Sequence, residues 1–277
     1  MKTGVYIIVL SGFLLLCIVI AYGLWIEPFQ IDVRHITIRT SKFKHVLKGK
    51  TVVHLSDLHI RAIGRREKKV LALMEELDPD LILMTGDYVR WRGDYNPAIS
   101  FFSNLRANIG VWAVMGDYDY SDTRNSCLFC HNSEIDGNGP EHGVHFLRNR
   151  AKRLILPGGD LFIVGVSTVN IRFAPLNGEF GIPSIKGQPR IILSHSPLLF
   201  DVIDERQEVL ILAGDTHGGQ IALPRWMWRL LDYEKCALYA QGMFQEGKKR
   251  MYVSRGIGTS FPHFRLLRPP EVVVFHF

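Results

Sequence analysis

Asp and His residues recur in this sequence directly after apolar runs that are typical of buried β-strands. Five runs are followed by such residues, namely Asp57 and His59, then Asp87, Asp117, His195, and finally Asp215 with His217. In open α/β sheets, ligands bind at the carboxyl ends of the strands. Carboxylates and imidazoles are also the usual protein ligands of divalent metal ions. A single such residue would be an ordinary turn Asp or core His, but the ordered set predicts a metal centre.

Apolar runs and helical patterns alternate after residue 50, which predicts sheets covered by helices. Strands are expected at 51–55, 81–84, 111–115, 161–166, 190–194, 209–213, 250–254 and 271–277. Residues 65–77 carry apolar side chains at the spacing of one helix face, and Asp78-Pro79 ends that helix. A second helix is expected near 97–107, and a long polar loop near 118–142. These elements would place the Asp and His residues at one rim.

The ordered motifs resemble those of the calcineurin-like metallophosphoesterase superfamily. They are Asp57-Leu-His59, Gly86-Asp87, Gly116-Asp117-Tyr118-Asp119, Ser194-His195 and Gly214-Asp215-Thr216-His217-Gly218-Gly219, against the family's D-x-H, G-D, G-N-H-[DE], H and G-H-x-H. The segments 218–220, 252–260 and 269–271 are similar to a membrane-associated branch that includes bacterial phosphodiesterases and UDP-diacylglucosamine hydrolases. The resemblance covers residues 50–277 and implies a four-layer αββα sandwich.

The resemblance also implies a dinuclear centre that hydrolyses phosphodiester or pyrophosphate bonds with a metal-bound hydroxide. Two ions roughly 3.5–4 Å apart supply the nucleophile and neutralise phosphoryl charge. The ligands implied for the first ion are Asp57, His59, Asp87 and His217, with Asp87 as the bridge. Those implied for the second ion are Asp87, Asp117, His195 and Asp215. Mn²⁺ is the favoured ion, with Mg²⁺, Fe and Zn²⁺ as alternatives.

Three positions depart from the family pattern. Asp117 replaces an Asn and Asp215 replaces a His, so the centre has four carboxylates instead of two and a formal charge lower by two. This favours a hard ion such as Mn²⁺ or Mg²⁺ and a less acidic metal-bound water. Tyr118 replaces a His that contacts substrate. Tyr118 either protonates the leaving group, as a weaker acid than imidazolium, or only packs and hydrogen-bonds there.

The amino-terminal residues predict a membrane anchor. Val5 to Ile26 is an uncharged run of 22 residues, enough to cross about 30 Å of hydrocarbon. A cleaved signal peptide, with a weak cleavage site at 21–23, is the alternative. The span is followed by Arg34, Arg39, Lys42 and Lys44 and preceded only by Lys2, which favours a cytoplasmic catalytic domain. We therefore divide the chain into an anchor (1–26), a juxtamembrane basic segment with a first strand (27–49) and a catalytic domain (50–277).

The net charge of +6 suits an anionic lipid surface or an anionic, lipid-linked substrate. The basic residues are scattered rather than gathered in one stripe, so nucleic acid is not favoured as a partner.

The loop after Tyr118 contains a second possible ligand set. Cys127-Leu-Phe-Cys130-His131 has the spacing of c-type haem attachment. With His142 and His145, the two cysteines also approach a structural zinc spacing. A local disulfide or two free thiols is the third reading. The alternative function is therefore a non-catalytic membrane protein on the same fold that binds metal or haem through residues 127–145.

Overall fold

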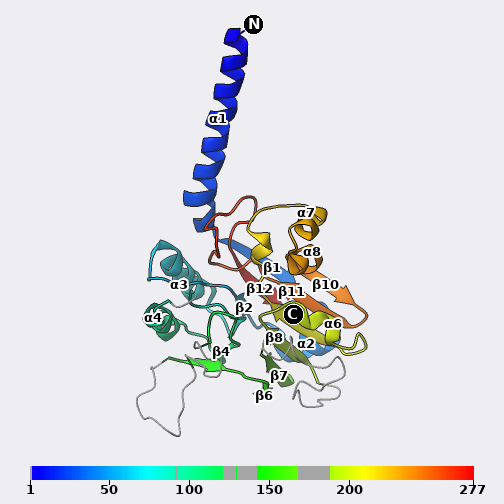
Figure 1. Cartoon of the computed structure of the whole chain (residues 1–277). Helices are drawn as coiled ribbons and strands as arrows, with labels where there is room; N and C mark the ends of the chain where they lie inside the picture. Colours follow the sequence, from blue (N-terminus) through cyan, green and yellow to red (C-terminus); the bar gives the residue numbers. More distant parts are fainter. Residues whose placement is uncertain (1, 91–92, 121–128, 130–141, 168–187) are drawn as a thin grey trace.

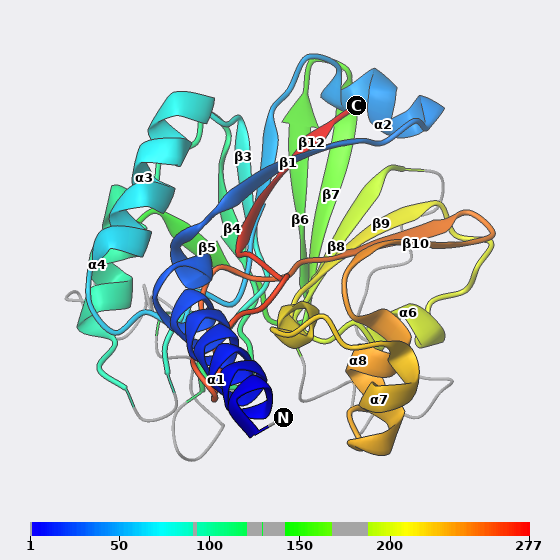
Figure 2. The same cartoon turned by 90° about the horizontal axis from the view of Figure 1, so that it is seen from above.

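The computed structural model describes residues 2–90, 93–120, 129, 142–167 and 188–277. Two six-stranded mixed sheets pack face to face (Figure 2). The strands of the first sheet, in spatial order, are β1 (Asp32–Thr37), β12 (Glu271–His276), β2 (Val52–Leu55), β3 (Leu81–Met84), β4 (Gly110–Ala113) and β5 (Val144–Phe146). Those of the second are β10 (Gly242–Glu246), β11 (Lys249–Val253), β9 (Val209–Ala213), β8 (Arg190–Ser194), β7 (Gly159–Val166) and β6 (Arg150–Leu156).

Helices pack on the outer faces of both sheets and at their edges. On the first sheet lie α3 (Arg65–Leu77) and α4 (Asn96–Asn104), whereas α2 (Ser41–Leu47) places Phe43 and Leu47 between the sheets. On the second sheet lie α6 (Leu199–Val202) and the end of α8 (Glu234–Tyr239), which follows α7 (Arg225–Leu230). The structure is therefore an α/β sandwich, and within the described residues its second helical layer consists of short helices.

The central strands are buried along their whole length, which explains why they are continuous apolar runs. Strands β2, β3 and β9 have no exposed residue, because both faces of each sheet are covered. All eight predicted strands are present, and the predicted helices correspond to α3 and α4. Strands β5, β6 and β10 were not predicted. They lie at sheet edges, and the exposed residues of β6 and β10 interrupt any apolar run.

Helix α1 (Lys2–Trp25) projects from the sandwich and is exposed almost along its full length (Figure 1). It is the one helix among the described residues that is long and apolar enough to cross a membrane. Its base is held by the domain: the Arg265 N–H donates to Gly23 O at 3.0 Å, and the buried Glu27 carboxylate accepts from the Leu267 N–H at 2.9 Å. The short helix η1 (Glu27–Phe29) then leads into β1.

Candidate metal centre

Five of the seven predicted ligands occupy tight turns immediately after strands. All five have a left-handed backbone, with φ of 51° at Asp57, 44° at His59, 56° at Asp87, 74° at Asp215 and 51° at His217. This conformation costs a residue other than glycine about 1–3 kcal/mol, and residues held in it are frequent at functional sites. The turns direct side chains from β2, β3 and β9 into one buried space.

Glycines next to these residues allow the turns to approach one another. A Cβ atom on Gly116 would lie 2.2 Å from Asp87 Oδ1, and one on Gly214 would lie 2.4 Å from Asp57 Oδ2. Neither contact is possible for a larger residue without moving the backbone. The glycines of the motifs therefore leave the space that the carboxylates of Asp87 and Asp57 occupy.

The first group of possible ligands is Asp57, His59 and His217. Their ligand atoms lie within 4.8 Å of one another, and all three side chains are buried. His59 Nε2 faces His217 Nε2 at 3.1 Å, and His217 Nε2 is 3.7 Å from Asp57 Oδ1. Two imidazole nitrogens that face each other beside a carboxylate can share one cation.

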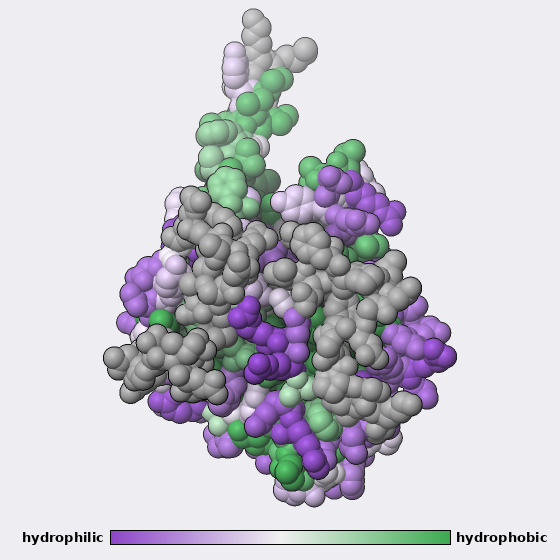
Figure 3. All heavy atoms as spheres, turned by 60° about the horizontal axis from the view of Figure 1, so that its bottom comes forward, coloured by the Kyte–Doolittle hydropathy of each residue, from purple (hydrophilic) through white to green (hydrophobic). Residues whose placement is uncertain are grey.

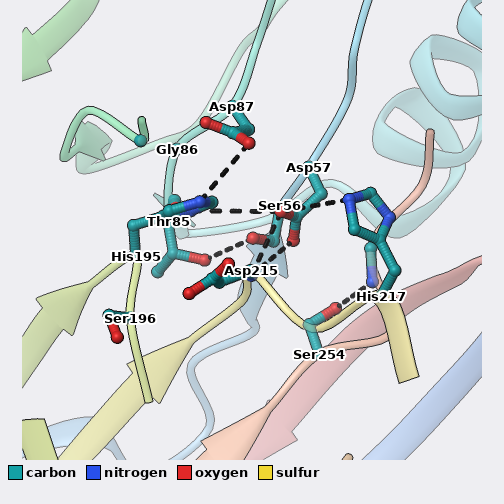
Figure 4. Close-up of polar contacts among 12 residues, drawn as sticks. Ser56, Asp57, Thr85, Gly86, Asp87, His195, Ser196, Asp215, His217 and Ser254 are labelled. Carbon is teal, nitrogen blue, oxygen red and sulfur yellow. Dashed lines mark hydrogen bonds and ion pairs between the residues drawn. The ribbon is translucent and has the colours of Figure 1, made fainter. Parts of the chain in front are cut away.

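The second group is Asp57, Asp87 and His195, also within 4.8 Å. Figure 4 shows His195 between Asp87 and Asp57, with His217 on the other side of Asp57. His195 Nδ1 donates to Thr85 O at 2.7 Å, because a carbonyl can only accept. This leaves Nε2, which lies 3.4 Å from Asp87 Oδ2, as the atom available to a metal ion. Asp87 Oδ2 is also 3.7 Å from His59 Nε2, so this carboxylate lies between both groups.

The structure places the three unusual residues around this cluster rather than within it. The Asp215 N–H donates to Asp57 Oδ1 at 3.1 Å, but the Asp215 carboxylate forms an ion pair with Lys235 Nζ of α8. Asp117 is half-buried and belongs to neither ligand group of the described residues. The Tyr118 N–H donates to Asp87 Oδ1 at 3.0 Å, and the Tyr118 ring packs edge-on against His59.

Burial and the charges of neighbouring side chains both shift the pKa values of the cluster. Burial raises the pKa of Asp57 to about 7 and lowers that of His59 to about 4. Burial alone would also lower the pKa of His195, but the carboxylates of Asp87, Asp57 and Asp215 together outweigh burial and hold this pKa well above its usual range. The buried carboxylates therefore require positive charge beside them, which a divalent ion would provide. The donor set thus fits divalent metal ions.

Asp119 has a structural role that we did not predict. Its buried carboxylate accepts from the N–H groups of Asp87 at 2.7 Å, Tyr88 at 2.8 Å, Gly116 at 2.8 Å and Val89 at 3.3 Å. It thereby joins the turns that follow β3 and β4. The sequence could have indicated this role, because Asp119 stands at the last position of the Gly116-to-Asp119 motif, where the family pattern has an acidic residue.

The loop of residues 254–270 holds the backbone of Asp57 in place. The Gly258 N–H donates to Asp57 O at 2.6 Å. The fully buried Arg265 guanidinium donates to the carbonyls of Arg255 at 2.8 Å and Gly258 at 2.6 Å, and burial lowers its pKa to about 9. Glu271 in turn accepts from Arg255 Nε at 2.9 Å. The tail segments that suggested the membrane-associated branch therefore form the wall behind the metal cluster.

The second predicted ligand set lies mostly outside the described residues, because Cys127, Cys130 and His131 are not among them. The two described members point in different directions. The His142 ring packs against Phe102 and Phe146, whereas His145 stacks on Trp112. Adjacent residues of β5 face opposite sides of the sheet, so His145 and Phe146 are on opposite faces. This placement does not favour one ion bound by both histidines.

A buried Asp and His cluster at the strand ends of an α/β sandwich is the arrangement expected of a metallophosphoesterase. The chain belongs to the calcineurin-like phosphoesterase family, whose model matches residues 50–219, and it is a phosphoester hydrolase.

Three curated relatives are similar over most of their length. The uncharacterized metallophosphoesterase YkuE of Bacillus subtilis is 28% identical over 92% of this chain and 88% of its own. The phosphodiesterase YaeI of Escherichia coli is 27% identical over 91% and 90%, respectively. The UDP-2,3-diacylglucosamine pyrophosphatase LpxG of Chlamydia trachomatis is 28% identical over 83% and 84%.

Proposed function

We propose that this protein hydrolyses a phosphodiester or pyrophosphate bond in a lipid-linked substrate at a dinuclear metal centre. The observation that carries the proposal is the buried cluster of two ligand groups that share Asp57 and meet at Asp87. When bound, two divalent ions supply an activated water and neutralise charge on the phosphoryl oxygens. Asp57, His59 and His217 would hold one ion, Asp87 and His195 the other, with Asp87 positioned to contact both.

A small pocket beside the cluster suits an anionic group. It has a volume of about 230 Å³ and is lined by residues that include His59, Arg90, Tyr118 and His263. Arg90 lies against the His263 ring, and Arg61 approaches the same ring at 3.2 Å. Burial and the carboxylates around it raise the pKa of Tyr118. We infer that Tyr118 contacts the substrate as a hydrogen-bond donor to a phosphoryl oxygen rather than as a strong acid.

We also propose that α1 is retained as a single-pass anchor that keeps the domain at the membrane surface. Cleavage after Gly23 would remove the carbonyl that accepts from Arg265. It would also separate Gly23 from the Phe264 ring, which lies so close that a Cβ atom on Gly23 would be 2.2 Å from it. The basic residues after the span support a cytoplasmic domain. Among the relatives, LpxG by its name acts on a diacylated substrate, which supports a lipid-linked substrate here.

Removal of metal should abolish hydrolysis reversibly. We expect full-length protein in detergent to lose cleavage of an aryl phosphodiester after treatment with a chelator, because the ligand cluster alone offers no nucleophile activation. Addition of Mn²⁺ should restore the rate, and Mg²⁺ should restore part of it. Metal content measured on the same samples provides the control. The proposal would be contradicted if the metal-free protein kept the full rate. It would also be contradicted if the protein, reloaded with each divalent ion in turn, cleaved no phosphoester.

Lys235 should weaken binding of the second ion, because its ammonium group competes with that ion for the Asp215 carboxylate. In Lys235→Met, the Asp215 carboxylate is released, and we expect the second ion to bind about tenfold more tightly, equivalent to about 1.4 kcal/mol. Lys235→Arg is the matched control, since it keeps the charge at this position. Calorimetric metal titration measures both. Unchanged affinity in Lys235→Met would show that Asp215 does not contribute to this site.

A further inference from the structure

A second, larger cavity also reaches the metal cluster. It has a volume of about 620 Å³ and extends from Asp215 and His217 to α7 and α8. Most of its wall is apolar and includes Ile221, Leu223, Trp228, Leu231, Phe261 and Pro262. Charged lining residues are confined to Asp215 and the segment 232–235. A hydrolase of small soluble phosphoesters does not need such a wall next to its metal centre.

Two residues that line this cavity are exposed and apolar, Leu231 at 52% and Phe261 at 90%. On α7 beside them, Leu230 is 78% exposed and Trp226 65%, and we refer to these four residues as the rim. Single exposed apolar residues are common on protein surfaces, but a group of them around the entrance of a cavity indicates a binding or membrane-contact surface. Arg225 and Arg229 of α7 are exposed among them. Basic and apolar side chains on one short helix suit the surface of an anionic membrane.

This rim lies on the side of the domain from which α1 projects. Figure 1 shows α7 level with the base of α1, and Figure 3 shows a hydrophobic patch beside the hydrophobic α1. The loop that contains Phe261 continues to Arg265 and Leu267, which contact Gly23 and Glu27 at that base. An anchored α1 therefore places the rim at the bilayer surface.

We propose that this cavity binds an acyl chain of the lipid substrate, which enters from the bilayer past α7. The phosphoryl group would then lie at the Asp and His cluster, and the polar remainder of the substrate in the pocket with Arg90 and His263. The two compartments lie on either side of Ser260 and Phe261, which line both. This inference rests on the proposed function and assigns the part of the site that selects the substrate.

Substitution of the exposed rim tests the proposal without disturbing the core. Leu230→Gln/Leu231→Gln should raise KM for a long-chain diacyl pyrophosphate substrate about tenfold, because one residue that lines the cavity and its exposed apolar neighbour both become polar. The same variant should leave the rate for an aryl phosphodiester unchanged. Ile155→Gln is the matched control, since Ile155 is 79% exposed on β6, away from the cavity. An equal effect on long-chain and short-chain forms of the substrate would overturn the proposal.

A second experiment does not depend on hydrolysis. Full-length protein without metal is mixed with a phospholipid that carries a diazirine at the end of one acyl chain, and the adducts formed on illumination are mapped by mass spectrometry. We expect adducts within residues 221–231 in addition to those on α1, and fewer of them in Leu230→Gln/Leu231→Gln. Adducts on α1 alone would reject the acyl site. If the adducts form but no phosphoester is cleaved, the proposed hydrolysis fails while the acyl site stands.

Discussion

Asp87→Asn should reduce turnover about 10³-fold, the largest loss that we expect from a single conservative change. Asp87 Oδ2 lies 3.4 Å from His195 Nε2 and 3.7 Å from His59 Nε2, so this carboxylate faces both ligand groups, which also share Asp57. An amide is neutral and has only one oxygen that can accept or ligate. Loss of about 4 kcal/mol of transition-state stabilisation corresponds to this factor. The measurement is kcat for an aryl phosphodiester at saturating Mn²⁺.

The control for Asp87→Asn is the same substitution at Asp78. Asp78 also has a left-handed backbone, with φ of 40°, but it ends α3 and lies away from the cluster. Asn tolerates this conformation, so Asp78→Asn should keep both turnover and stability. Thermal unfolding of both variants would show whether either change affects the fold. Wild-type turnover in a folded Asp87→Asn protein would contradict a shared carboxylate at this position.

Asp119→Ala should lower the free energy of unfolding by about 3–5 kcal/mol. The substitution leaves four N–H groups of two buried turns without their acceptor, and each unsatisfied buried donor costs about 1–3 kcal/mol before the turns relax. Because these turns carry Asp87 and Gly116, metal affinity should fall as well. Thermal unfolding of the metal-free protein measures the first effect, and metal titration below the melting temperature measures the second.

Asp119→Asn separates loss of the acceptor from loss of charge. The Asn side chain retains one oxygen and can satisfy part of the N–H set, so we expect a smaller loss of stability than in Asp119→Ala. Burial and the neighbouring Asp87 raise the pKa of Asp119 to about 7, so part of its role does not require full ionisation. If Asp119→Ala were as stable as the wild type, the carboxylate would not be what holds the two turns together.

The central strands and helix α3 were predictable because their signals are local. Buried strands need continuous apolar runs, and α3 needs an apolar face that ends at a residue able to adopt a left-handed backbone, here Asp78. The edge strands β6 and β10 have no such signal, since half or more of their residues face solvent. Their position depends on pairing with β7 and β11, which sequence spacing does not reveal.

The types of residue at the metal centre were also readable from the sequence, because each motif directly follows a strand. The sequence did not reveal which of these residues lie in the ligand cluster and which lie around it. Four carboxylates in the motifs suggested a strongly acidic second site, but Lys235, distant in sequence, pairs with Asp215 and offsets one of those charges. The role of Asp119 depends on the turn geometry after two different strands.

The sequence by itself determined the class of chemistry, because metal ligation depends on side-chain type and on the order of short motifs along neighbouring strands. The tertiary structure alone decided which of the possible ligands lie together in one buried cluster and which of them pairs with a counter-ion. It also placed the apolar cavity between the metal cluster and α7, beside the base of α1. These features depend on distances of a few ångströms between segments far apart in the chain, and no local pattern encodes such distances.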